Sequence, residues 1–69
     1  MQIIRISWKE QLEIMYNVAL IYGLDNWEQT RDLMRTALIE RYGTKVTFDF
    51  ELGETKEIED FNNWLENGE

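Results

Sequence analysis

This chain contains no cysteine and no histidine, so neither a disulfide nor a zinc site of the usual kind can hold a small fold together. A domain of its length, 69 residues, buries only about 60% of the surface that the unfolded chain exposes. Apolar side chains must therefore supply the stability, and the hydrophobic content of 43% is typical of a folded domain. We expect a single domain over residues 1–69.

The missing residue types also exclude most catalytic designs. A Ser-His-Asp or Cys-His nucleophile and a histidine general base all need residues that the sequence lacks. Its one serine, Ser7, lies at a predicted helix start, where capping accounts for it. The four glycines are isolated, so there is no glycine-rich phosphate loop. We predict a protein that is not an enzyme and needs no cofactor.

The N-terminal third predicts a short strand and then a helix. Residues 2–6 are rich in isoleucine, which favours a strand. Ser7 and Glu10 form an S-x-x-E pattern, in which each side chain can accept from a free backbone N–H at a helix start. The helix is expected over 8–22, where apolar residues recur every three or four positions: Trp8, Leu12, Met15, Ala19 and Tyr22, with Tyr16 and Leu20 widening the face.

A second helix is expected over 27–42. Two start signals overlap before it, Asp25 with Glu28 and Asn26 with Gln29, and the sequence leaves both open. The spacing places one set of side chains on an apolar face: Trp27, Thr30, Met34, Ala37, Leu38 and Tyr42, with Arg31 and Arg35 on the other side. The connection between the two helices is short, which predicts antiparallel neighbours.

Residues 44–52 give the clearest strand, because polar and apolar side chains alternate strictly. The apolar face would hold Val46, Phe48, Phe50 and Leu52, and the polar face Lys45, Thr47, Asp49 and Glu51. Thr55 is then expected to cap a helix over 56–66, with Trp64 at its flank and three residues facing inward: Ile58, Phe61 and Leu65.

The predicted elements give an α+β domain of order β-α-α-β-α, with a two-stranded sheet packed on the helices. Each glycine would end an element: Gly23, Gly43, Gly53 and Gly68. Six aromatic residues are expected in the core: Trp8, Trp27, Tyr42, Phe48, Phe50 and Phe61. Both strands of such a sheet are edges, so a homodimer is expected through a strand edge or a spare tryptophan surface.

The net charge of −7 is concentrated in the last third of the chain. Residues 1–45 carry six acids and six bases, whereas residues 46–69 carry eight acids against Lys56 alone, which gives −7. Such a segment repels nucleic acid and anionic lipid and attracts basic proteins. A second interpretation, that the acids only keep the protein soluble, stays open.

Two groups of closely spaced carboxylates have the chemistry to bind magnesium or calcium: Asp49 with Glu51, and Glu57 with Glu59 and Asp60. Neither group matches a known metal-binding loop. No metal is therefore predicted. The longest uninterrupted apolar run is 18–22, far short of the roughly 20 residues that cross a bilayer, so we expect a cytoplasmic protein without a membrane segment.

Two acidic runs suggest a role for the charge: Asp49-Phe50-Glu51-Leu52-Gly53-Glu54 and Glu57-Ile58-Glu59-Asp60. Side chains two residues apart on a strand lie about 6–7 Å apart, a separation comparable with neighbouring phosphates. In size and acidity the chain resembles the small acidic proteins with which phages inactivate host factors. That class includes DNA mimics that block nucleoid proteins of the HU type, uracil-DNA glycosylase, restriction enzymes or CRISPR effectors.

The resemblance implies an inhibitor that binds the basic, nucleic-acid-binding surface of a host protein in the host cytoplasm. The runs themselves supply the partner-binding candidates: Asp49, Glu51, Glu54, Glu57, Glu59 and Asp60, with Trp64 as an apolar anchor or as an ordinary packing residue. The alternative is a small adaptor or regulatory module that uses an apolar patch or a strand edge.

Overall fold

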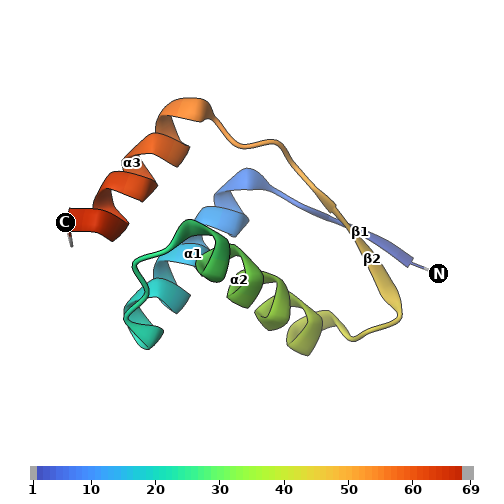
Figure 1. The fold of residues 1–69 in the computed structure, drawn as a ribbon. Helices are drawn as coiled ribbons and strands as arrows, with labels where there is room; N and C mark the ends of the chain where they lie inside the picture. The colour runs from blue at the N-terminus through green and yellow to red at the C-terminus, as the bar shows by residue number, and fades with distance from the viewer. Residues whose placement is uncertain (1, 68–69) are drawn as a thin grey trace.

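The computed structural model describes residues 2–67 and contains the five predicted elements in the predicted order (Figure 1). They are β1 (Gln2–Ile6), α1 (Trp8–Tyr22), α2 (Trp27–Tyr42), β2 (Val46–Phe50) and α3 (Thr55–Asn67). The α+β class and the β-α-α-β-α order are therefore confirmed. Gly68, expected after the last helix, lies outside the described residues.

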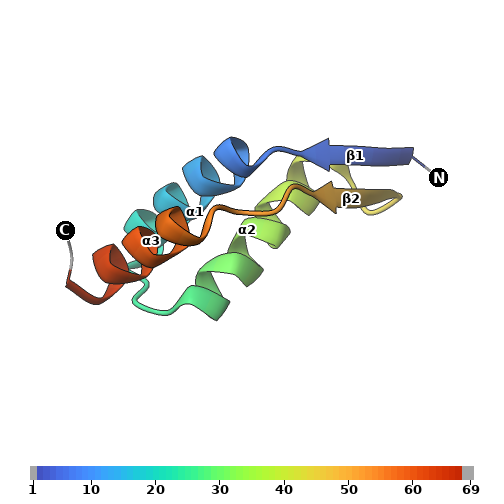
Figure 2. The same ribbon diagram turned by 90° about the horizontal axis from the view of Figure 1, so that it is seen from above.

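The two strands pair in parallel because the helices between them form a hairpin. α1 has 15 residues and α2 has 16, so α2 returns the chain to the end from which α1 departed. β2 then starts beside the start of β1, with Gln2 opposite Val46 and Arg5 opposite Asp49. From above, α1 and α3 continue in the direction of the strands while α2 runs back beneath them (Figure 2).

Only one face of the sheet packs on helices. Ile6 is fully buried, and Ile4, Phe48 and Phe50 are partly buried against the core. The other face exposes four side chains: Ile3, Arg5, Thr47 and Asp49. This outer face is where the acidic side of β2 was predicted to lie.

Four aromatic rings join the three helices. Phe61 of α3 is fully buried, and its ring meets Tyr16 of α1 at 4.7 Å and Trp27 of α2 at 5.6 Å between centroids. Trp64 lies 4.8 Å from Tyr16 and 5.8 Å from Phe61. We call Tyr16, Trp27, Phe61 and Trp64 the aromatic cluster. Such pairs contribute about 0.5–1.5 kcal/mol beyond the area that they bury.

The core differs in part from the six aromatics that were predicted. Trp8 and Phe61 are buried, and Trp27, Phe48 and Phe50 are partly buried against them. Tyr42 was wrongly assigned to the core, because it stands at the end of α2 and is 38% exposed, with its ring against the edge of Phe48.

The apolar stripe of α1 is narrower than predicted towards its end. Leu20 and Tyr22 are exposed, at 68% and 63%: Leu20 is turned about 140° from the buried Met15 at 100° per residue, and Tyr22 is the last residue of the helix. Val18 and Ala19 are the buried residues there. The last turn of α1 therefore presents apolar side chains to solvent.

The strand predicted over 44–52 is shorter at both ends, since it runs over Val46–Phe50. The last bond between the strands runs from Glu51 N–H to the Ile6 carbonyl, at 2.9 Å, and the partner strand ends there. Leu52 was expected on the apolar face but is 92% exposed, because the chain has left the sheet. Thr55 is the first residue of α3 rather than its cap, since Ile58 N–H already donates to the Glu54 carbonyl.

Side-chain caps start both long helices. Ser7 Oγ accepts from Glu10 N–H at 3.1 Å, as the S-x-x-E pattern predicts. At α2 the structure decides between the two open alternatives, since Asn26 Oδ1 accepts from Gln29 N–H at 3.0 Å. Gly23 ends α1 with φ of 64° and ψ of 42°, the left-handed conformation that glycine adopts without strain.

Replacing Asn26 by alanine is expected to lower the free energy of unfolding by about 1 kcal/mol, because one backbone N–H of α2 loses its acceptor. Asp25→Ala is the matched control, since Asp25 is the adjacent exposed acid and does not cap the helix. It should cost less than about 0.5 kcal/mol. Urea denaturation of the two variants measures both values. Equal losses would show that Asn26 is not the cap in solution.

Candidate functional site

Asp49 and Glu51, the first two predicted contact residues, share one cation on the outer face of the sheet. Arg5 stands opposite Asp49 in the strand register. Its Nη1 lies 3.3 Å from Asp49 Oδ2, and its Nη2 lies 3.6 Å from Glu51 Oε2. The side chains of Arg5 and Asp49 are largely exposed and that of Glu51 is partly exposed, so these pairs are screened by water and contribute little stability. Their main effect is to reduce the negative charge of this surface, because Arg5, Asp49 and Glu51 together carry −1, whereas the two acids alone would carry −2.

Two of the predicted carboxylates also accept hydrogen bonds from Trp8. Glu51 Oε1 accepts from the backbone N–H of Trp8 at 3.0 Å, which places a negative charge at the N-terminus of α1. Glu57 Oε1 accepts from the indole N–H of the same residue at 3.1 Å. Glu51 and Glu57 thus tie β2 and α3 to the start of α1. Their role within the fold was not foreseen from the sequence.

The remaining predicted acids point to solvent. Glu54, Glu59 and Asp60 are exposed, and so is Glu66 on α3. Within residues 2–67 none of these four carboxylates makes an ion pair or a hydrogen bond. At 100° per residue, Glu59 and Glu66 fall on one flank of α3 and Asp60 on the other, beside Glu57 and Trp64. The predicted single row of carboxylates is therefore divided between two sides of this helix.

Trp64 is half-buried, with its ring in the aromatic cluster and one side open to a groove. The groove lies where α1 and α3 end and has a volume of about 490 Å³. Its lining is mainly apolar, with acids at two positions: Ala19, Leu20, Gly23, Leu24, Asp25, Trp64, Leu65, Glu66 and Asn67. The packing and the anchor interpretations of Trp64 are thus compatible.

The end of the molecule at this groove is electronegative. A helix carries a partial negative charge at its C-terminus, and basic side chains in the last turn usually compensate it. Neither α1 nor α3 has a basic residue in its last turn. Asp25 and Glu66 add two carboxylates to the groove lining. The surface therefore combines apolar contact area with attraction for cations.

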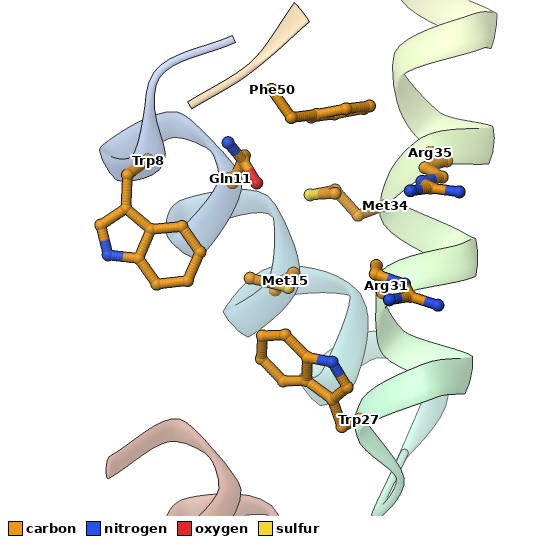
Figure 3. A pocket seen from close by; sticks show the side chains of 8 residues that line it. All are labelled: Trp8, Gln11, Met15, Trp27, Arg31, Met34, Arg35 and Phe50. Carbon is orange, nitrogen blue, oxygen red and sulfur yellow. The ribbon is translucent and has the colours of Figure 1, made fainter. Parts of the chain in front are cut away.

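A smaller cavity lies between α1 and α2 (Figure 3). Arg31 and Arg35 line it together with Met34, which corrects the prediction that both arginines face away from the apolar side of α2. Gln11, at its edge, donates to the carbonyls of Ile6 and Glu51 at 3.2 and 2.9 Å. The sequence contains a signal for this cavity, because Arg31 and Arg35 are one helical turn apart and both are close to Met34 on the helix surface.

Within residues 2–67, no three acidic side chains stand close enough together to hold a metal ion. Nor does this part of the chain contain a helix that is both long and apolar enough to span a lipid bilayer.

Comparison of the chain with models of protein families, with curated proteins and with solved structures gives no match.

Proposed function

We propose that this domain is an acidic, protein-binding inhibitor that occupies the basic nucleic-acid-binding surface of another protein as a DNA mimic. The supporting observation is the set of four exposed, unpaired carboxylates in and around α3: Glu54, Glu59, Asp60 and Glu66. Unpaired surface acids speed encounter with a basic partner and fix its orientation. The partner class is a nucleoid protein, a DNA repair enzyme or a defence nuclease in the host cytoplasm.

The contact surface in this proposal is centred on α3 rather than on the sheet. Asp49 and Glu51 already share Arg5, and Glu51 and Glu57 already accept from Trp8. These three acids contribute to the negative field, while Glu54, Glu59 and Asp60 are free to pair with a partner's cations. A homodimer with two-fold symmetry would present two such surfaces.

A second candidate is an adaptor module that binds through the apolar groove at the ends of α1 and α3. The observation that favours it is the exposure of Leu20, at 68%, in the same groove as the half-buried Trp64. Half-buried aromatic residues in grooves are common anchors of protein interfaces. In this case the acids only keep the domain soluble, and the binding affinity is little changed by high salt.

Neutralising Glu54, Glu59, Asp60 and Glu66 together, as glutamine or asparagine, is expected to weaken binding to a basic DNA-binding protein by tenfold or more. The assay measures how well the domain displaces labelled duplex DNA from an HU-type nucleoid protein. A pull-down from cell lysate at low and high salt, read by mass spectrometry, searches for other basic partners.

The matched control neutralises Glu13, Glu28, Asp32 and Glu40, which are exposed acids of α1 and α2. It changes the net charge by the same four units at other places and should leave the affinity within about twofold. Equal weakening by both sets would mean that only total charge matters. Binding that survives high salt but is lost in Trp64→Ala would contradict the inhibitor proposal and support the adaptor.

A further inference from the structure

The cavity between α1 and α2 is a small apolar site with charge on one side. Its volume is about 90 Å³. Figure 3 shows Met15 and Met34 in the middle, Trp8 and Trp27 around one side, Phe50 from β2 at one end, and Arg31 and Arg35 along α2. Side chains from both helices and the sheet thus line one space, and among the described residues that line it only Arg31 and Arg35 are charged.

Arg31 and Arg35 lack the partners that the other described arginines have. Arg5 pairs with Asp49 and Glu51, and Arg41 pairs with Glu10. Within residues 2–67, no carboxylate lies within 4.0 Å of Arg31 or Arg35, although the chain has twice as many acids as bases. The guanidinium carbon of Arg35 stands over the Phe50 ring, 5.4 Å from its centroid.

One hydrogen-bond donor at this site is buried and unsatisfied. Arg31 Nε is inaccessible to solvent and has no acceptor in the described part of the chain. Burying a donor without an acceptor is destabilising, and more so when the group is charged. The water-accessible space of the cavity does not reach this Nε, so the donors that an acceptor in the cavity would meet are the terminal nitrogens of Arg31 and Arg35, which make no hydrogen bond within residues 2–67. A carboxylate is the acceptor that matches the planar fork of a guanidinium.

We propose that this cavity binds a small monocarboxylate, with a compact apolar group among Met15, Met34 and the two tryptophans and the carboxylate on Arg31 and Arg35. A cavity of roughly 150 Å³ accommodates benzene, so about 90 Å³ accommodates a branched group of about four carbons. The site is separate from the exposed carboxylates in and around α3, none of which lines the cavity. Its ligand has the charge that the rest of the surface repels, so recognition depends on these two arginines.

The probe is 3-methylbutanoate, which has a branched four-carbon group on its carboxylate. Binding is followed through the indole N–H signals of Trp8 and Trp27 in ¹H–¹⁵N spectra, since both rings line the cavity. We expect saturable shifts of these two signals at millimolar ligand. The uncharged 3-methylbutanamide and the short acetate ion should each bind at least about tenfold more weakly.

Two variants test the arginines. Arg31→Gln with Arg35→Gln should weaken binding of 3-methylbutanoate by tenfold or more and leave binding of the amide unchanged. Arg41→Gln is the control, because it removes an exposed arginine of the same helix that does not line the cavity. The proposal is wrong if acid and amide bind the wild-type protein equally, if acetate binds as well as the branched acid, or if Arg41→Gln causes the same loss.

Discussion

Replacing Phe61 by alanine is expected to leave most of the protein unfolded at room temperature. Phe61 is fully buried and is the ring through which α3 contacts both α1 and α2. Removing a buried phenylalanine costs about 3–5 kcal/mol, and a domain of this size is stable by only about 3–10 kcal/mol. Far-UV circular dichroism with urea titration measures the loss.

Two further variants make this prediction specific. Phe61→Leu keeps most of the buried volume and should cost about 1–2 kcal/mol with the fold intact. Tyr22→Ala removes an aromatic ring that is 63% exposed and should change stability by less than about 0.5 kcal/mol. If Phe61→Ala were as stable as Tyr22→Ala, α3 would not pack on the helices through this ring.

Gly53→Ala is expected to destabilise the fold by about 1–3 kcal/mol. Replacing glycine by alanine in a loop usually stabilises a protein where alanine can adopt the backbone conformation of that position. Gly53 has no positive φ, so its backbone suits alanine. The obstacle is Trp8, because a Cβ at position 53 would lie 2.7 Å from two atoms of its ring and 2.9 Å from a third. Carbon atoms in contact normally stay about 3.5–4.0 Å apart.

Moving the Trp8 ring away from position 53 would disturb its buried packing and the hydrogen bond that its indole N–H donates to Glu57. Leu52→Ala is the control for the same loop, and it should have almost no effect because Leu52 is 92% exposed. Combining Gly53→Ala with Trp8→Leu should cost less than the sum of the two single changes, since the clash disappears. Additive losses, or a stabilised Gly53→Ala, would contradict the close packing.

The fold was predictable where local patterns and tertiary packing agree. The helices over 8–22 and 27–42 were bounded correctly, because Ser7, Asn26 and the following glycines act through nearby backbone groups. The error at the end of β2 came from a contact distant in sequence. Leu52 continues the alternation of β2, but its partner strand has already ended, and no local signal in the sequence reports that end.

The sequence predicts which acids make up the candidate site, but it does not predict which of them bind other side chains of the domain. The concentration of acids after residue 45 is visible in the sequence. That Arg5 would reach Asp49 and Glu51 depends on the parallel register, and that Glu57 would accept from Trp8 depends on how α3 packs. Both facts need the tertiary structure. Fewer acids are therefore free to bind a partner than the eight acids after residue 45 suggest.

The start of β1 and the end of α3 lie at opposite ends of the long axis, along which the molecule measures 40 Å (Figures 1 and 2). Proteins fused at these two positions would be held apart by the full length of the domain instead of meeting side by side. The domain thus suits use as a short rigid spacer in line between two partners, and it is poorly suited to insertion into a loop, where the two ends must come together.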